Sequence, residues 1–179
     1  PYCGKLMADM GAEVIKIEPP SGEPGRRLAP FIQDKPSLDS SLPFFYLNSN
    51  KKGITINLKT DNGISILKDF IKKTDVIIEN FSPGTLNRLG IGYDTIHSIN
   101  SSAVVVSISN FGQTGPYRDY KATEIIEYAL GGLMSIFGAY DKPPIKHALN
   151  QAQIKAGTNA ANAALMAIYW SKLNGKGQH

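Results

Sequence analysis

The stretch from Asp75 to Gly90 constrains the fold of this chain more than any other. Residues 76–78, Val-Ile-Ile, form a short β-branched run that is typical of a strand covered on both faces. Ser82 and Pro83 favour a helix start, because serine caps helix N-termini and proline fits the first helical position. The stretch therefore predicts a buried strand that leads through a short loop into a helix.

The same alternation of strands and helices continues along the chain. Further strands are expected at 12–17, 54–58 and 103–109, and helices at 63–73, which Asp61 can cap, 93–99, 123–136 and 156–173, besides a first helix that Gly11 ends. Such alternation is typical of an α/β fold with an open parallel sheet. Residues 19–43 form a long loop rich in Pro, Gly, Ser and Asp, which is either functional or a mobile surface excursion.

Three side chains near the end of the strand at 76–78 suggest a ligand. Ligands of open α/β sheets bind outside the carboxyl ends of the strands, and a helix start attracts anions. Asn80 offers a polar contact, Phe81 a stacking ring and Arg88 a cation. From these residues alone, an ordinary strand–helix joint with a surface arginine is the alternative.

The charged and metal-binding residues narrow the possible functions. The chain has 19 Lys and Arg against 15 Asp and Glu, spread along its length, which favours a small anionic ligand over nucleic acid. One cysteine and three distant histidines predict no disulfide framework and no metal site. No phosphate-binding glycine motif is present. No apolar run is long enough to cross a membrane, and the cysteine usage fits a cytoplasmic protein.

Six segments together resemble the family III CoA-transferases, the CaiB/BaiF family. They are Met7–Glu18, Asn48–Lys52 with Ile56–Lys59, Glu79–Gly84 with Leu89–Gly90, Gly112–Tyr117, Gly131–Met134 and Gly175–Gln178. The resemblance implies a Rossmann-like large domain and an interlocked homodimer. Residues 1–179 are then expected to be the N-terminal part of that CoA-binding domain, without its first strand and its C-terminal half.

The resemblance also implies a binding site for coenzyme A. The positions that match CoA-contacting places of the family are Ile56, Asn57, Leu58, Lys59, Asn80, Phe81, Ser82, Arg88 and Lys121. An aromatic ring for adenine and cations for phosphates agree with the chemistry of these side chains. Pro19 stands where some members carry a CoA-binding arginine, so that contact is absent or is replaced from Arg26 and Arg27.

The catalytic position departs from the family pattern. The transferases use an aspartate nucleophile in a loop before the last helix, which forms an acyl anhydride and then an aspartyl-CoA thioester. That place holds Gln153, and the histidine base of the related racemases falls at Glu124. Three explanations remain open: Gln153 hydrogen-bonds the thioester in a ternary route, Glu124 or Glu127 acts instead, or the protein binds CoA without turnover.

The expected activity is movement of CoA from an acyl-CoA thioester to a free carboxylic acid. An acyl-CoA racemase or epimerase and a non-catalytic CoA-binding protein are the alternatives. The expected substrates are an acyl-CoA and a carboxylate. The sequence does not specify the acyl group.

Overall fold

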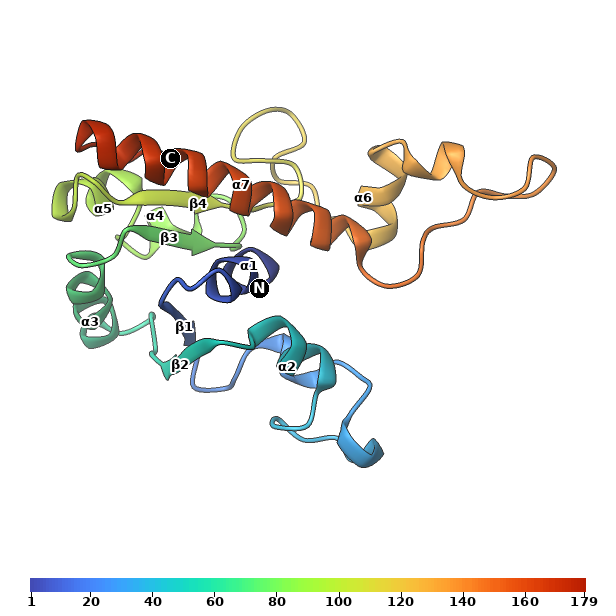
Figure 1. Cartoon of the computed structure of the whole chain (residues 1–179), viewed down its shortest axis with the longest axis horizontal. Coiled ribbons are helices and arrows are strands. Elements are labelled where there is room, and N and C mark those ends of the chain that lie inside the picture. Colours follow the sequence, from blue (N-terminus) through green and yellow to red (C-terminus); the bar gives the residue numbers. More distant parts are fainter.

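Four short strands form two parallel pairs in the computed structural model, which describes residues 1–179 (Figure 1). Strand β1 (Val14–Glu18) pairs with β2 (Lys51–Thr55), and β3 (Val76–Glu79) pairs with β4 (Val104–Ser107). Both pairs are parallel, which confirms the α/β class. No ladder joins β1 to β3, so the expected open sheet is present as two separate pairs.

Helices connect and flank these strands. The α-helices are α1 (Tyr2–Asp9), α2 (Leu42–Asn48), α3 (Asp61–Ile71), α4 (Thr85–Arg88), α5 (Tyr93–Ile99), α6 (Glu124–Leu130) and α7 (Gln151–Asn174), and three 3₁₀ turns are η1 (Pro24–Arg27), η2 (Ile32–Asp34) and η3 (Leu133–Ile136). The expected helix at 93–99 is confirmed at both ends. No helix is both long enough and apolar enough to cross a membrane.

The main apolar core lies between β3, β4 and the helices α3 and α5. Ile71, Ile96, Ala103 and Val105 form its buried centre. The side-chain amide of Asn100 donates to the carbonyl oxygens of Ile71 and Thr74 at 2.9 and 3.0 Å, and so ties the end of α5 to the end of α3. This core fixes the strand end that precedes Asn80.

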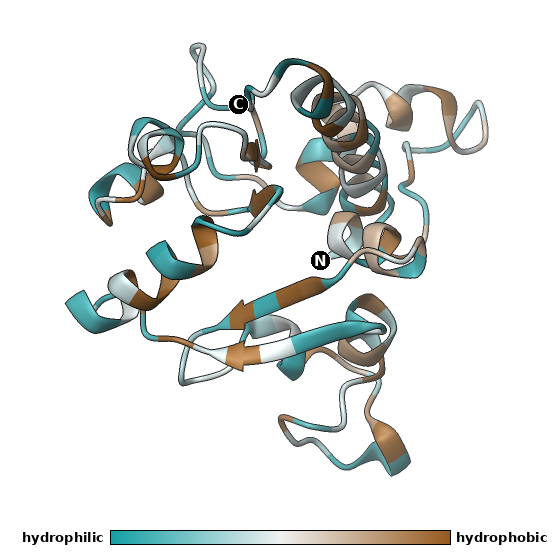
Figure 2. Ribbon diagram, turned by 60° about the vertical axis from the view of Figure 1, so that its left-hand side comes forward, coloured by the Kyte–Doolittle hydropathy of each residue, from teal (hydrophilic) through white to brown (hydrophobic).

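Helix α7 packs on α1 through a face of small residues (Figures 1 and 2). Gly157, Ala161 and Ala164 are buried on that face. A methyl group added at Gly157 would lie 2.8 Å from Cβ of Tyr2, so only glycine permits this approach. Helix α7 begins at Gln151, five residues earlier than the expected start at Ala156.

The strand expected at 54–58 lies instead at 51–55. Ile56 is buried and its N–H still donates to Glu18, but the chain then turns, because the Asn57 carbonyl accepts from the Thr60 N–H at 3.2 Å. Thr60, not Asp61, caps α3: its hydroxyl accepts from the Gly63 N–H at 3.1 Å. The prediction was wrong because the alternation of apolar residues continues through Ile56 and Leu58, which lie beyond the end of β2.

Two expected helix boundaries are also wrong. Helix α4 begins at Thr85 after Gly84, whose φ of 77° is left-handed, so Ser82 is not its cap and the helix is a single turn. The helix expected at 123–136 ends at Leu130, because Gly132 adopts a φ of 79° and separates α6 from η3. Helix α2, which Ser41 caps, was not predicted.

Candidate functional site

The loop after β2 holds the first group of predicted ligand contacts, residues 56–59. The Asn57 side chain accepts from the Lys59 N–H at 3.1 Å, and the Asn57 carbonyl accepts from the Thr60 hydroxyl at 2.9 Å. A Cβ at Gly63 would lie 2.0 Å from that carbonyl oxygen, so the loop sits directly against the first turn of α3. These contacts hold the loop in one shape and leave Lys59 exposed.

The loop after β3 holds the second group, residues 80–82. The Phe81 N–H donates to the Glu79 carboxylate at 2.7 Å, and the Phe81 ring remains 41% exposed. Arg88 donates to the Thr85 hydroxyl at 2.7 Å and has no acidic partner. The segment after β3 therefore carries an exposed ring at Phe81 and, at Arg88, a cation free of ion pairs. No hydrogen bond joins this loop to residues 56–59.

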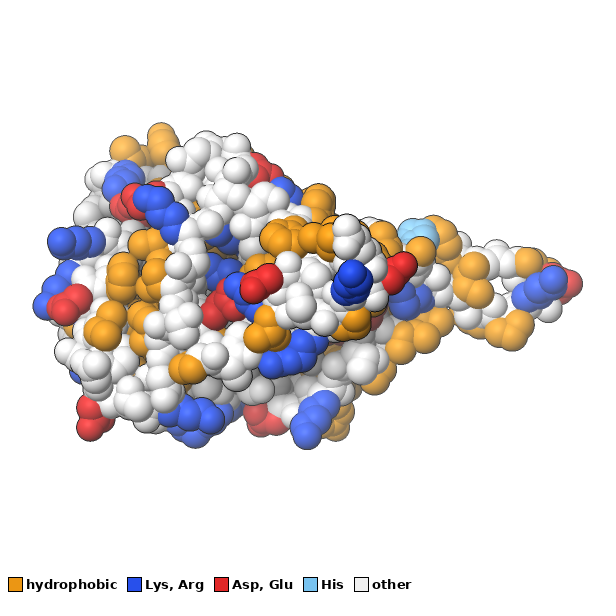
Figure 3. Space-filling view, turned by 90° about the horizontal axis from the view of Figure 1, so that it is seen from below, with side chains coloured by type: hydrophobic (Ala, Val, Ile, Leu, Met, Phe, Trp, Pro, Cys, Tyr) orange, Lys and Arg blue, Asp and Glu red, His pale blue; other side chains and the backbone are white.

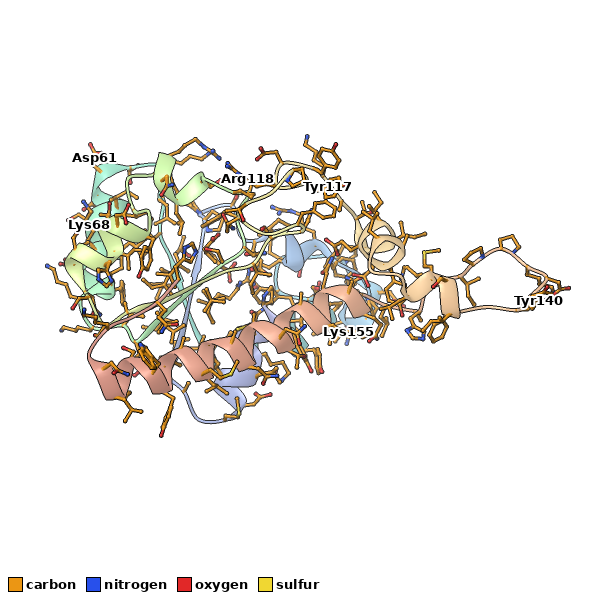
Figure 4. The ribbon with its side chains drawn as sticks, turned by 90° about the horizontal axis from the view of Figure 1, so that it is seen from above. Asp61, Lys68, Tyr117, Arg118, Tyr140 and Lys155 are labelled. Atoms are coloured by element: carbon orange, nitrogen blue, oxygen red, sulfur yellow. The ribbon has the colours of Figure 1, made fainter.

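A second arginine that sequence analysis missed lies near Arg88. A Cβ built at Gly84 would lie 3.4 Å from Arg88 Nη1 and 3.7 Å from Arg118 Nη2. Arg118 follows Tyr117 (Figure 4). The Tyr117 ring meets the rings of Tyr120 and Phe111, with centroids 5.3 and 6.3 Å away. The sequence Gly-Pro-Tyr-Arg at 115–118 could have indicated this arginine, because glycine and proline favour a turn and the turn is followed by a ring and a cation. Lys121, farther along, is exposed and unpaired.

A pocket of about 290 Å³ opens at the ends of β1 and β2. Pro19 and Arg26 both line it. The Arg26 guanidinium donates to both carboxylate oxygens of Glu18 at 2.7 and 2.9 Å, and to Asp39 at 2.9 Å. This hydrogen-bonded guanidinium holds the pKa of the buried Glu18 below its ordinary value. The Arg26 guanidinium is therefore already hydrogen-bonded to Glu18, Asp39 and the Leu38 carbonyl within the protein.

The structure brings the two predicted catalytic positions together. Glu124 is 9% exposed, and its carboxylate accepts from the backbone N–H groups of Ala152 and Gln153 at 2.7 and 3.3 Å. Gln153 belongs to the first turn of α7 rather than to the loop before it, and its side chain is exposed and makes no hydrogen bond. Sequence analysis found both residues but not the link between them.

Glu127 occupies a different environment one turn along α6. Burial and, to a smaller extent, the negative charge of Glu124 raise the pKa of Glu127. With its side-chain amide oriented to satisfy both neighbours, Asn110 donates to Glu127 at 3.0 Å and accepts from the Ala122 N–H at 3.2 Å. Glu127 therefore faces the loop after β4, whereas Glu124 faces α7.

The family model for CoA-transferase family III matches residues 1–179. The chain is 40% identical, over 99% of its length, to the succinyl-CoA–D-citramalate CoA-transferase of Chloroflexus aurantiacus and to the formyl-CoA:oxalate CoA-transferase of Streptomyces avermitilis. It covers 44% and 42% of those two proteins. The chain thus spans less than half the length of these curated relatives.

Solved structures agree with the sequence match. A CaiB/BaiF family protein from Brucella suis superimposes with a TM-score of 0.92 at 32% identity, over 100% of this chain and 47% of that protein. The Mycobacterium tuberculosis protein Rv3272 superimposes with a TM-score of 0.85 at 27% identity, over 99% of this chain and 48% of that protein. Because the family model and the fold both match along the whole chain, this protein belongs to CoA-transferase family III, the CaiB/BaiF family.

Proposed function

We propose that the protein transfers coenzyme A between an acyl-CoA thioester and a free carboxylic acid. The match of the family model along all 179 residues carries this proposal. The names of similar proteins combine this one reaction with different acids, among them succinate with glutarate, and acetyl-CoA with oxalate. The reaction class therefore follows from the similarity, while the acyl group and the acceptor acid do not.

Coenzyme A is proposed to bind along the strand ends. Its contacts would be Ile56, Asn57, Leu58, Lys59, Asn80, Phe81, Ser82, Arg88 and Lys121, with Arg118 added from its position beside Gly84. The exposed ring of Phe81 suits the adenine, and the cations of Lys59, Arg88 and Lys121, which have no acidic partner, suit the phosphates. Arg118 is paired with the neighbouring Asp119 at 3.3 Å. The fixed loop at 56–59 supports this proposal, because a preorganised loop loses little entropy on binding.

Residues 1–179 are proposed to be the N-terminal part of a larger CoA-binding domain that forms an interlocked homodimer. The unpaired strand edges support the proposal that these residues are part of a larger domain. Strand β1 pairs only with β2, and β3 pairs only with β4, so each leaves one edge without a ladder. One more parallel strand between β1 and β3 would turn the two pairs into a continuous sheet.

Gln153 is proposed to act as a hydrogen-bond donor instead of a nucleophile. An uncharged amide does not form the acyl anhydride that an aspartate forms. In the ternary route, the acceptor carboxylate attacks the thioester carbonyl and expels the CoA thiolate, which leaves a mixed anhydride. The thiolate then attacks the carbonyl carbon of the acceptor and releases the original acid. The free side-chain N–H groups of Gln153 suit the thioester oxygen, on which negative charge develops.

A non-catalytic CoA-binding protein is the second candidate, and Gln153 is the observation that favours it. A racemase is less well supported. It needs a base that removes the α-proton, and both oxygens of Glu124 already accept backbone N–H groups.

One assay on the full-length protein separates these functions. A 2-methylacyl-CoA, a free carboxylic acid and D₂O are mixed, and the CoA thioesters are identified by mass spectrometry. A new thioester made from the added acid is expected. Deuterium at the α-carbon without a new thioester would establish the racemase instead, and neither change across a panel of acids would establish a CoA-binding protein without turnover.

Two substitutions test the role of Gln153. Gln153→Ala should lower the exchange rate about a hundredfold, the usual cost of losing one donor to a developing oxyanion. The matched control is Gln151→Ala, which removes the same side chain two residues earlier on α7. Unchanged exchange in Gln153→Ala would exclude a catalytic role, and exchange in Gln153→Asp where the natural protein has none would indicate a lost active site.

A further inference from the structure

We propose that Glu124 is a positioning residue that holds the first turn of α7 and so fixes the backbone from which Gln153 projects. This inference rests on the proposed function, since it matters for catalysis only if Gln153 does. It assigns Glu124 a role different from the proton-transfer role that the resemblance suggested.

The first turn of α7 depends on Glu124 for its hydrogen bonds. The first N–H groups of a helix have no partner within the helix and need outside acceptors. The Asn150 side chain, which stands at the cap position, accepts none of them. The Glu124 carboxylate accepts those of Ala152 and Gln153, from a residue 29 positions before Gln153 in the chain. Glu124, although distant in sequence, thus acts as the N-terminal cap of α7.

The charge of Glu124 suits this position. The N-terminus of a helix carries partial positive charge, and a carboxylate placed there is stabilised. Glu124 is 9% exposed, so solvent weakens the attraction little. Glu124 occupies the N–H groups of Ala152 and Gln153, and the exposed side chain of Gln153 makes no hydrogen bond, so it remains free to meet a substrate oxygen.

A second contact between the same two helices supports the arrangement. Tyr128, one turn after Glu124 on α6, is buried, and the Lys155 ammonium lies 6.0 Å from the centre of its ring. Lys155 follows Gln153 by two residues on α7 (Figure 4). Helix α6 therefore contacts the beginning of α7 at two points, and Glu124 makes the one that includes Gln153.

The experiment compares Glu124→Gln, Glu124→Asp and the control Asp94→Asn in the full-length protein. Asp94 is an exposed carboxylate in the first turn of α5, so the control removes the same kind of charge from another helix start. Amide hydrogen exchange of peptides that contain residues 150–156 reports the first turn of α7. Steady-state kinetics of CoA exchange give kcat and KM for the acyl-CoA.

Glu124→Gln should speed exchange at residues 152–153 about tenfold, because an amide oxygen is a weaker acceptor than a carboxylate. It should lower kcat about ten- to a hundredfold with KM nearly unchanged, as expected when a reacting group is displaced and binding is not. Glu124→Asp, which keeps the charge on a shorter arm, should fall between Glu124→Gln and the natural protein. Asp94→Asn should match the natural protein in both measurements.

Each other outcome has a definite meaning. Unchanged hydrogen exchange at residues 152–153 in Glu124→Gln would overturn the inference, whatever the kinetics. Loss of kcat with that protection intact would make Glu124 a proton-transfer group and would also overturn it. If the natural protein transfers no CoA, the proposed function fails. Faster hydrogen exchange in Glu124→Gln would then establish that Glu124 caps α7 without a consequence for catalysis.

Discussion

Two long connecting segments of this protein differ in how they are held. The segment at 19–43 folds back against β1 and α2, and buries Ser40 and Ser41. The segment at 131–150, here called the arm, projects from the body (Figure 1). Hydrophobic side chains lie along its surface (Figure 3), and Tyr140 at its tip is fully exposed.

The difference comes from buried polar contacts. In the first segment, the Arg26 guanidinium joins Glu18, the Leu38 carbonyl and Asp39, and lies 3.9 Å from the centre of the Phe44 ring. The arm is held by less. The side chain of His147, in the arm, forms a hydrogen bond with the hydroxyl of Tyr128 on α6. A long loop therefore gains order from the polar groups that it buries, and loop composition alone does not predict this.

The largest expected effect is at Arg26. Arg26→Ala leaves the buried Glu18 without its cation, which should lower the free energy of unfolding by about 3 kcal/mol. Arg27→Ala is the control, because Arg27 is exposed and its side chain bonds only the Ser21 carbonyl. Urea denaturation measures both. Equal losses in the two variants would mean that the ion cluster does not hold this segment.

The same cluster predicts a dependence on pH. Because the folded protein lowers the pKa of Glu18 from its ordinary value of 4.5, the stabilisation is complete above that pH. It is lost as the pH falls through the lower pKa of the folded state. Unfolding free energies measured from pH 6 to pH 3 should therefore fall less steeply in Arg26→Ala than in the natural protein.

A smaller loss is expected at Ser41, which is 1% exposed. Its hydroxyl lies 2.6 Å from the Leu28 carbonyl and 3.1 Å from the Gly25 carbonyl, and it accepts from the Phe44 N–H. Ser41→Ala removes these bonds and the cap of α2, at about 1–2 kcal/mol in denaturation. Ser21→Ala, on the exposed part of the same segment, should change stability by less than half that amount.

On α6, Tyr128→Phe keeps the ring and removes the hydroxyl that bonds His147 of the arm. A loss of about 1 kcal/mol is expected in denaturation, with faster hydrogen exchange confined to the arm. Faster exchange at 19–43 would contradict the view that the two segments are held independently.

The smallest effect is expected at the tip of the arm. Tyr140→Ser should change the unfolding free energy by less than about 0.5 kcal/mol, because a fully exposed side chain loses no packing. A larger loss in the full-length protein would show that the tip of the arm is covered there.

The sequence predicted what depends on local pattern. The β-branched runs gave three strands within two residues of their observed starts and ends, and the helix at 93–99 was located from its own residues. The resemblance gave the family, and it selected Gln153 and Glu124. The end of β3, which precedes Phe81, was predicted from its β-branched run, whereas the end of β2 was placed too close to Lys59.

What the sequence did not predict depends on distant partners. Thr60 and Asp61 are both acceptable caps, and Thr60 is the one observed, with its hydroxyl also donating to the Asn57 carbonyl. The Glu18–Arg26 pair spans a loop without periodicity. The link from Glu124 to α7 crosses the arm, so no short sequence window contains both ends of it.

The contact between α1 and α7 has a consequence for how the chain is made. Cys3 and Met7 of α1 are buried, and α7, which packs on α1, is the last helix in this sequence. A ribosome that adds about 5–20 residues per second needs roughly seven to thirty seconds to proceed from α1 to α7. During that interval the nascent α1 has no surface of α7 to pack on, and its apolar face is open to chaperones.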